Sequence, residues 1–300
     1  KGFALRQAVN GLRGQERIQI FEEAIETFDR ALEIDPKFAE AWAGKGVICD
    51  DLATFNNDSA RYNDSLAAYD KAIELAPTND SRNLAQAYEG KAVALSHMGQ
   101  DLAARGQIEE SRAVLKEAVK NYDKVIDLDP DFALANLYLS FSDGSYYPEK
   151  FDKAISLKDK VSKGEQIYLE MLDNQRKGNG TEMEKNCRAF EELYPGDPRT
   201  QYILGSYIYY GDDEKAIFYL KKATELDRNF APPYADLGLK YQSMGNFEEA
   251  EKNFLRYAEL LPDYPNSLQQ LGTIYRVEGN LDKALEFYFK MLSGDPSTVT

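Results

Sequence analysis

The amino-acid sequence predicts an all-α protein built as a solenoid of about eight antiparallel helix pairs. Three observations lead to this fold class. A set of residues recurs at a fixed period, the apolar members of the set follow helical spacing, and turn-forming residues separate each apolar stretch from the next. One helical hairpin of this kind cannot bury its own apolar face, so successive hairpins must stack on one another.

The repeated pattern is clearest in residues 234–296, where it occurs twice. In the first copy, Tyr234, Leu237 and Tyr241 are spaced so that they share one face of a helix. Ala250 and Phe254 mark the same face of the next helix. The second copy follows 34 residues later and carries Leu268, Leu271, Gly272, Tyr275, Ala284, Tyr288 and Met291.

Small and turn-forming residues complete each copy of the pattern. Gly238 predicts a close approach of two helix axes, because a larger side chain there would overpack. Gly245–Asn246 and Gly279–Asn280 predict the turns between paired helices, since both residue types tolerate positive φ. Pro262 and Pro296 are expected to end the second helix of each pair.

These residues resemble the signature of the tetratricopeptide repeat family, in which W-x2-L-G-x2-Y is followed by A-x3-F and then by Pro. The resemblance implies a right-handed superhelical solenoid that binds partners without catalysis. It covers most of the chain and is closest in residues 201–296. The phrase FEELYPGDP at residues 190–198 resembles helix ends of prokaryotic members, so we expect a prokaryotic source.

Residues 1–143 are expected to form irregular N-terminal repeats with insertions at 50–64 and 100–116. The first repeat, residues 3–36, predicts one helix around 3–12 and a second over 18–32. The insertion at 50–64 would be either a longer turn or a one-turn extension of each flanking helix. The insertion at 100–116 has helical composition and predicts two extended helices in a long, protruding hairpin.

Residues 144–198 are expected to be divergent repeats that join this part to regular repeats at 199–300. The break at 144–148 precedes a short helix around 151–157. Helices are then predicted over 164–177 and 183–194, with a glycine-rich turn between them. The join near 144–163 is where we expect the superhelical path to change.

Composition excludes several classes of function and leaves location open. A net charge of −15 argues against nucleic-acid binding, which needs clustered Lys and Arg. No apolar run approaches the roughly 20 residues of a membrane-spanning helix. The chain begins at Lys1 rather than Met, so we expect a trimmed or mature form. A cytoplasmic location is favoured, with an extracytoplasmic one if a signal segment was trimmed.

No group of residues predicts catalysis, a cofactor or a metal site. His97 has no Cys, Asp or Glu near it at ligand spacing, and no phosphate loop or nucleophile motif occurs. Cys49 and Cys187 are interpreted as core helix residues rather than a disulfide. We interpret four Asn-x-Ser/Thr sequons as chance occurrences, and they lie at Asn57, Asn63, Asn79 and Asn179.

The resemblance implies that the first helix of each pair lines a concave groove. Aromatic, amide and charged side chains there would suit a peptide backbone. The candidate partner-binding residues are Tyr202, Tyr209, Asp236, Lys240, Gln269, Gln270, Thr273 and Arg276. The two-carboxylate clamp of some family members is absent, because its positions hold Ala43, Gly44, Val47, Glu89 and Gly90. Chaperone C-terminal peptides are therefore not expected as ligands.

We therefore predict a non-catalytic scaffold or adaptor that binds a protein or peptide in this groove. Two alternatives stay open: the interaction region of a larger regulatory or enzymatic protein, and a self-associating solenoid. The predicted last helix, residues 281–292, would leave Phe287 and Phe289 partly bare, and no polar terminal helix follows. We expect that the natural protein continues there or that another molecule covers this end.

Overall fold

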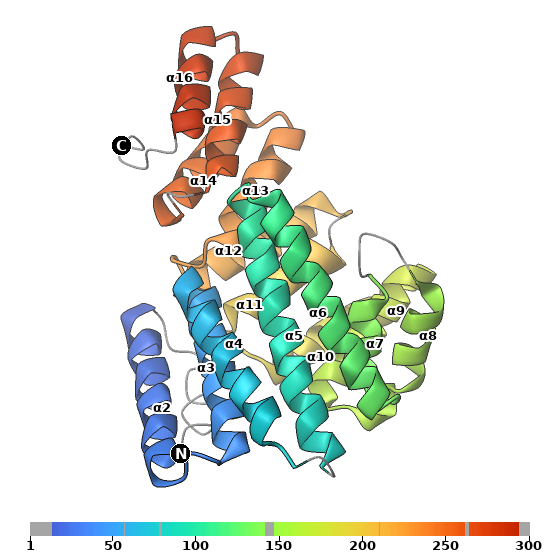
Figure 1. Ribbon diagram of the computed structural model, residues 1–300. Coiled ribbons are helices and arrows are strands. Elements are labelled where there is room, and N and C mark those ends of the chain that lie inside the picture. Colours follow the sequence, from blue (N-terminus) through green and yellow to red (C-terminus); the bar gives the residue numbers. More distant parts are fainter. Residues whose placement is uncertain are drawn as a thin grey trace. The chain divides into compact units, whose positions relative to one another are not determined.

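The computed structural model describes residues 14–56, 58–77, 80–141, 147–209, 211–261 and 264–293 (Figure 1). Every regular element in these ranges is a helix, which confirms the prediction of an all-α chain of helix pairs. The predicted helix at 3–12, the break at 144–146, Pro262, Pro296 and the sequons at Asn57 and Asn79 lie outside the described residues.

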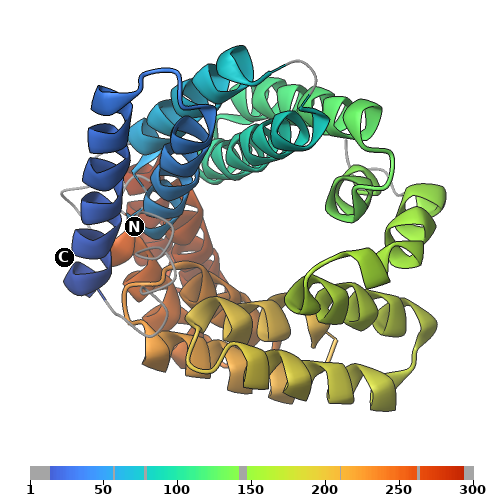
Figure 2. The ribbon, with the colours of Figure 1, turned by 90° about the horizontal axis from the view of Figure 1, so that it is seen from below.

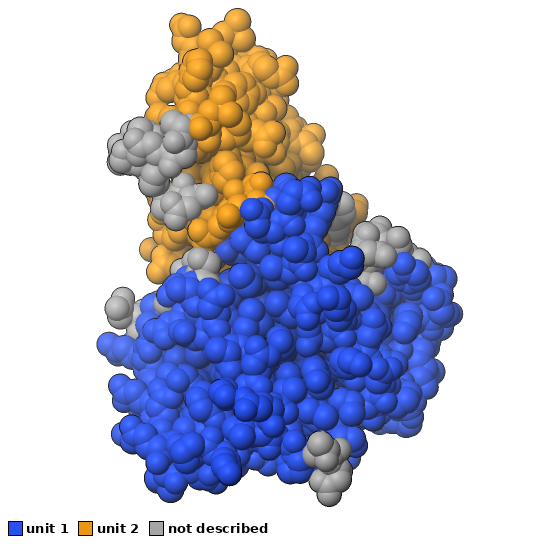
Figure 3. Space-filling model, viewed as in Figure 1, with its two compact units in different colours: residues 1–102, 108–189 blue, residues 103–107, 190–300 orange. Residues whose placement is uncertain are grey.

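The chain divides into two compact units, coloured separately in Figure 3. Unit 1 comprises residues 1–102 and 108–189, and unit 2 comprises residues 103–107 and 190–300. The change between the units at residues 189 and 190 falls inside the stretch 144–198 that the sequence marked as divergent.

The helices of unit 1 follow one another along a curved path (Figure 2), and α5 and α10 end in residues that belong to unit 2. They are α2 (Gly14–Ile34), α3 (Ala39–Asn56), α4 (Ser59–Leu75), α5 (Ser81–Ala104), α6 (Ile108–Leu128), α7 (Ala133–Leu139), α8 (Pro148–Ser156), the 3₁₀ turn η2 (Lys158–Lys160), α9 (Lys163–Lys177) and α10 (Gly180–Leu193).

Both N-terminal insertions are helical. The insertion at 50–64 lengthens α3 and α4, so it extends the helices instead of forming a long turn. The insertion at 100–116 lengthens α5 to 24 residues and α6 to 21. Asp58 begins α4 as its N-cap, with its carboxylate accepting a hydrogen bond from the Ala60 amide.

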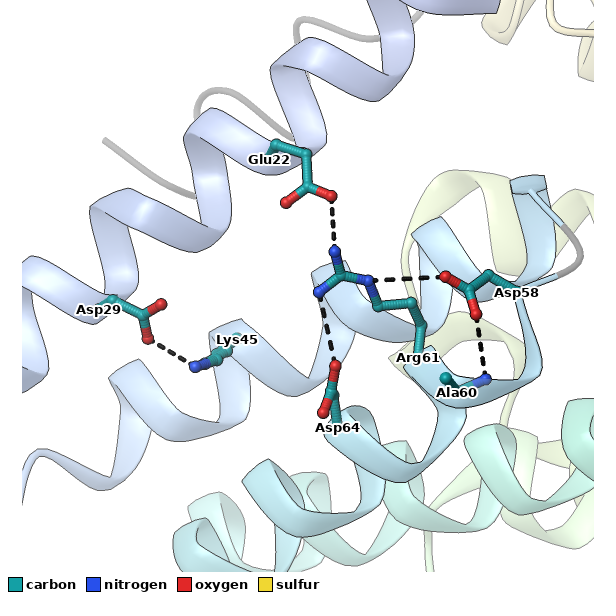
Figure 4. Close-up of polar contacts among 7 residues, drawn as sticks. All are labelled: Glu22, Asp29, Lys45, Asp58, Ala60, Arg61 and Asp64. Carbon is teal, nitrogen blue, oxygen red and sulfur yellow. Dashed lines mark hydrogen bonds and ion pairs between the residues drawn. The ribbon is translucent and has the colours of Figure 1, made fainter.

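Ion pairs tie the first helices of unit 1 together (Figure 4). Arg61 of α4 reaches Glu22 of α2 at 2.7 Å, and Lys45 of α3 lies 2.6 Å from Asp29 of α2. Each such partly exposed pair contributes at most about 1 kcal/mol. They add to the apolar packing around Phe21, which joins α2 and α3.

Among the later helices of unit 1, α9 is capped at both ends. Ser162 and Glu165 form a capping box at the start of α9, satisfying two backbone donors that would otherwise lack partners. Gly178 ends α9 with φ of 71°, a left-handed conformation that glycine adopts without steric cost. Phe151 and Leu169 are buried between α7, α8 and α9.

Unit 2 repeats one hairpin design three times. Its helices are α11 (Pro198–Ile203), the π turn η3 (Leu204–Ile208), α12 (Asp213–Leu226), α13 (Pro232–Ser243), α14 (Phe247–Leu260), α15 (Pro265–Val277) and α16 (Leu281–Ser293). Leu220, Leu237, Phe254 and Leu271 are buried in one continuous core. Each hairpin therefore shares its apolar surface with the next, as stacked repeats must.

The glycines of the repeated pattern lie where paired helices approach most closely. A Cβ atom built on Gly238 would be 2.6 Å from the Phe254 ring, and one on Gly272 would be 2.6 Å from the Tyr288 ring. A Cβ on Gly205 would meet Leu220 at 2.8 Å. The sequence-based expectation of close helix approach at Gly238 is confirmed.

In each turn of the regular repeats, a glycine and the following asparagine have different roles. Gly245 and Gly279 have φ of 74° and 80°, as expected. Asn246 does not share that conformation, since its φ is −85°. Its side chain instead caps α14 by accepting a hydrogen bond from the Glu249 amide, so the Asn is present as a cap.

The sixth repeat turns differently from the regular ones, and its spacing from Gly205 to Gly238 is 33 positions instead of 34. The Tyr209 amide donates to the Leu204 carbonyl at 2.9 Å, five residues back, which makes the last turn a π turn. Residues after Leu204 consequently fall at different angles around the helix than α-helical spacing predicts.

Candidate partner-binding site

The eight residues expected to bind a partner lie on the first helices of unit 2. Tyr202 and Tyr209 lie in the α11–η3 segment, Asp236 and Lys240 in α13, and the other four in α15. The structure thus places the predicted set on three successive first helices. Some of these residues lie close together, and one of them, Tyr209, is buried.

Asp236 forms the best-defined polar cluster of unit 2. Its carboxylate accepts a short hydrogen bond from the Ser206 hydroxyl, and Tyr202 and Tyr207 lie close enough to interact with it electrostatically. Burial raises the pKa of Asp236, and the hydrogen bonds from Ser206 and Tyr202 oppose that rise. The Tyr202 ring packs edge-on against Phe230 at a centroid distance of 5.4 Å.

Lys240 and Tyr209 are engaged within the chain. The Lys240 ammonium lies 2.8 Å from Asp213, and only 13% of its side chain is exposed. Tyr209 is 5% exposed and stacks on Tyr219 at 5.3 Å. As the π turn rotates Tyr209 into the core, this residue presents almost no surface to a partner, unlike the expectation from regular spacing.

The four residues of α15 form a polar face. Gln269 and Arg276 are exposed, and Gln270 and Thr273 are half-buried. The Thr273 hydroxyl donates to the Gln269 carbonyl at 2.9 Å and lies 3.3 Å from the Tyr288 hydroxyl. Amide and guanidinium groups therefore remain available on this helix for hydrogen bonds to another molecule.

A cavity of about 430 Å³ lies in unit 1, in a region where the sequence indicated no site. Residues of α3, α4, α5, α7 and α9 line it. Its floor is made of small or apolar residues, among them Ala43, Gly44, Val47 and Gly90. The Tyr69 ring forms part of the wall and packs directly beneath Gly90, where a Cβ atom would be 2.4 Å away.

The polar groups of this cavity are acidic or amide side chains. Glu40, Glu89 and Glu165 come from three different helices, and Asn83 joins them. The Asn83 amide donates to Glu40 at 3.3 Å, and Glu165 accepts from the Ser162 amide at 2.8 Å. Among the lining residues there is no Lys, Arg or His.

The sequence contained one signal for this cavity. Ala43, Gly44, Val47, Glu89 and Gly90 were identified only as replacements for a basic clamp. The smallness of Ala43, Gly44 and Gly90 leaves open space at these positions, since no large side chain projects from them. All five contribute to its lining.

Two other hollows have a different character. One of about 350 Å³ adjoins the cavity in unit 1 and shares Gln86, Phe132, Leu134 and Glu165 with it. Its lining is mainly polar and includes Arg82 and Asp131. Another of about 470 Å³ lies in unit 2 and is lined mostly by long charged side chains of α14. Of these three hollows, the 430 Å³ cavity is the one lined mainly by small and apolar residues together with a few polar groups, as ligand sites typically are.

Groups that could support chemistry are sparse in the described part of the chain. No three His, Cys, Asp or Glu side chains gather there as a metal site would require. His97 Nδ1 lies 3.1 Å from both carboxylate oxygens of Asp50, a pairing the sequence did not predict. Cys49 and Cys187 are buried free thiols, as expected.

Among the residues that the structure describes, no helix has the length and apolar character needed to span a membrane.

Two stretches of the chain match the tetratricopeptide repeat family, residues 19–80 and residues 203–230. "Protein CTR9 homolog" of Arabidopsis thaliana is 26% identical over 95% of this chain and 28% of its own length. "Tetratricopeptide repeat protein 6" of Homo sapiens is 27% identical over 46% of this chain and 36% of its own length. The chain thus spans roughly a third or less of these curated relatives.

Similar solved structures include a crystal structure of MamA, with 23% identity and a TM-score of 0.36 over 62% of this chain and 91% of that one. Another is the APC/C hetero-tetramer Cut9-Hcn1, with 17% identity and a TM-score of 0.46 over 92% of this chain and 57% of that one.

Proposed function

We propose that this chain, which belongs to the tetratricopeptide repeat family, is a non-catalytic scaffold that binds a peptide segment or protein surface along its first helices. Repeats of this kind make interaction scaffolds. The proposal that the partner binds to the face formed by the first helices is supported by one observation, the cavity of unit 1 with its apolar floor.

The cavity supports this function because several helices build it jointly. Ala43 and Gly44 lie on α3, Gly90 on α5 and Leu134 on α7, so a ligand would contact successive repeats at once. Contact across repeats gives a continuous surface that suits an extended segment. A volume of about 430 Å³ holds only a few side chains, so it would act as an anchor pocket within a longer contact.

We propose further that the first helices of unit 2 contribute polar recognition. The proposed residues are the members of the predicted set other than Tyr209, namely Tyr202, Asp236, Lys240, Gln269, Gln270, Thr273 and Arg276. The Asp236 cluster could accept hydrogen bonds from a partner, and the amides of α15 could pair with a peptide backbone. Tyr209 is left out because of its burial.

Affinity capture from the source organism tests the proposal with three variants of the full chain. Ala43→Leu fills the cavity from a half-buried position, and Ala67→Leu makes the same change at an exposed position of α4. The triple change Tyr202→Ala/Gln269→Ala/Arg276→Ala removes the polar face of unit 2. A protein captured by wild type and Ala67→Leu but lost with Ala43→Leu is expected. Capture that survives both the cavity-filling variant and the triple variant would sink the proposal.

Self-association is a second candidate, favoured by the outer face of α16. Phe289 is 67% exposed, and Leu281, Leu285 and Leu292 are exposed beside it on the same helix. Such an exposed apolar patch suits a contact with a second copy. Sedimentation should then show a dimer that Phe289→Glu dissociates. Wild-type chain that stays monomeric at every concentration would exclude this candidate.

The alternative that these repeats serve as the interaction region of a larger regulatory or enzymatic protein is compatible with the same surface. It would place any catalysis elsewhere and leave the cavity as the point of contact. The length of the full gene product, together with the capture experiment, separates the two cases.

A further inference from the structure

We propose that the cavity of unit 1 accepts a lysine or arginine side chain from an extended peptide partner. This inference rests on the proposed function, because it names the chemistry of the segment that the scaffold would hold. The methylene stem of the basic side chain would lie on the apolar floor. Its charged end would meet an acidic rim formed by Glu40, Glu89 and Glu165.

The shape of the cavity fits such a side chain. Lys and Arg bury their methylene stems against apolar surface while the charged group stays near water. The floor around Ala43, Gly44 and Gly90 provides an apolar surface without projecting side chains, and the Tyr69 ring bounds one wall.

The rim supplies complementary charge. Glu40, Glu89 and Glu165 come from α3, α5 and α9, so the fold holds three negative charges around one opening. No residue that lines this cavity is basic, and Arg82 lines the adjoining hollow that shares Glu165. In the adjoining hollow, Lys160 is already paired with Asp131 at 2.6 Å.

The rim carboxylates are oriented by the fold and keep acceptor capacity. Glu165 uses one oxygen in the capping box of α9, and Glu40 accepts one long hydrogen bond from Asn83. A carboxylate has about four acceptor sites, so Glu40 and Glu165 can each take a further donor.

Other occupants fit less well. An acidic peptide would be repelled by the three glutamates at close range. A purely apolar segment would cover them and leave their charges desolvated without a partner, which is costly. A net charge of −15 also favours encounter with basic partners over acidic ones.

Selection of random twelve-residue peptides on the immobilised full chain tests the inference. Wild type should enrich peptides that share Lys or Arg at one fixed position. Binding of the best peptide, followed by fluorescence anisotropy, should then fall at least about tenfold when that residue is changed to Met, which keeps the stem and removes the charge.

Two triple variants with equal charge change locate the effect. Glu40→Gln/Glu89→Gln/Glu165→Gln removes the rim charges and keeps the capping box, since Gln also fills that role. Glu33→Gln/Glu110→Gln/Glu149→Gln changes three exposed glutamates of unit 1 that do not line the cavity. The rim variant should weaken the best peptide by about tenfold or more, and the control by less than about threefold.

The outcomes separate this inference from the proposed function. Enriched peptides without a basic residue, or equal losses in the two triple variants, would overturn the inference even if Ala43→Leu abolishes binding. In that case the groove function stands with a different ligand. Peptides that bind Ala43→Leu as tightly as wild type, or the absence of any enriched peptide, would overturn both.

Discussion

Replacement of Gly238 by Ala tests the packing that underlies the repeats. Gly238 lies inside α13, and a Cβ atom there would be 2.6 Å from the Phe254 ring of α14. That ring is 2% exposed, so it cannot swing into solvent to make room. Either the ring or the helix must therefore shift.

Two opposing effects set the size of the change. Ala favours a helix interior over Gly by about 1 kcal/mol. Overpacking a closed core costs about 1–3 kcal/mol, and a contact this short belongs at the upper end. We expect Gly238→Ala to lower the free energy of unfolding of this hairpin by about 2 kcal/mol, since the clash outweighs the propensity gain.

Amide hydrogen exchange in α13 and α14 measures this change locally. The single Trp residue, Trp42, lies in unit 1, so its fluorescence would not report directly on this hairpin. Gly211→Ala is the matched control in unit 2, because no heavy atom lies within 4 Å of a Cβ built at Gly211. The control should change stability by less than about 0.5 kcal/mol.

A double-mutant cycle with Phe254→Leu isolates the clash. The smaller side chain should relieve much of the penalty at position 238, so the two changes should couple by at least about 0.5 kcal/mol. If Gly238→Ala stabilised α13 and α14, or if the two changes were additive, close helix approach would not be the reason for glycine at this position.

Three further outcomes follow from local contacts. Hydrogen bonds and charge from Lys153 and Lys160 lower the pKa of Asp131 to about 2, so its stabilising contribution is present above pH 3.8 and lost as pH falls toward 2. Carboxyl NMR titration should show this midpoint, and Lys160→Ala should raise it. Burial raises the pKa of Cys49 to about 12, so a thiol reagent at neutral pH should label it only after unfolding; rapid labelling of the native chain would contradict this. Ser162→Ala removes a cap of α9 and should cost about 1 kcal/mol by hydrogen exchange, whereas Ser162→Asp should cost little.

Much of the fold could be predicted from the sequence because the regular repeats carry the same helical pattern twice. The spacing of Tyr234, Leu237 and Tyr241 predicted a helix that the structure shows as α13. The helical composition of 100–116 likewise predicted the long helices α5 and α6. These patterns are local, and local periodicity is the strongest signal in a single sequence.

Features that depend on one missing residue or on several helices could not be predicted. The shorter sixth repeat was visible in the spacing from Gly205 to Gly238, but not the π turn that buries Tyr209. The cavity of unit 1 exists because Ala43 and Gly90 have small side chains or none, and small residues at separate positions form no recognisable sequence motif. His97 and Asp50 meet across 47 residues, a distance over which periodicity carries no information.

Hydrogen exchange of the full chain with and without the best selected peptide tests the central claim most directly. If the first helices of unit 1 bind the partner, protection should increase in α3 and α5 around Ala43 and Gly90, and Ala43→Leu should abolish it. Protection confined to α6 or to α16 would contradict the account, because neither helix lines the cavity and the partner would then bind outside it.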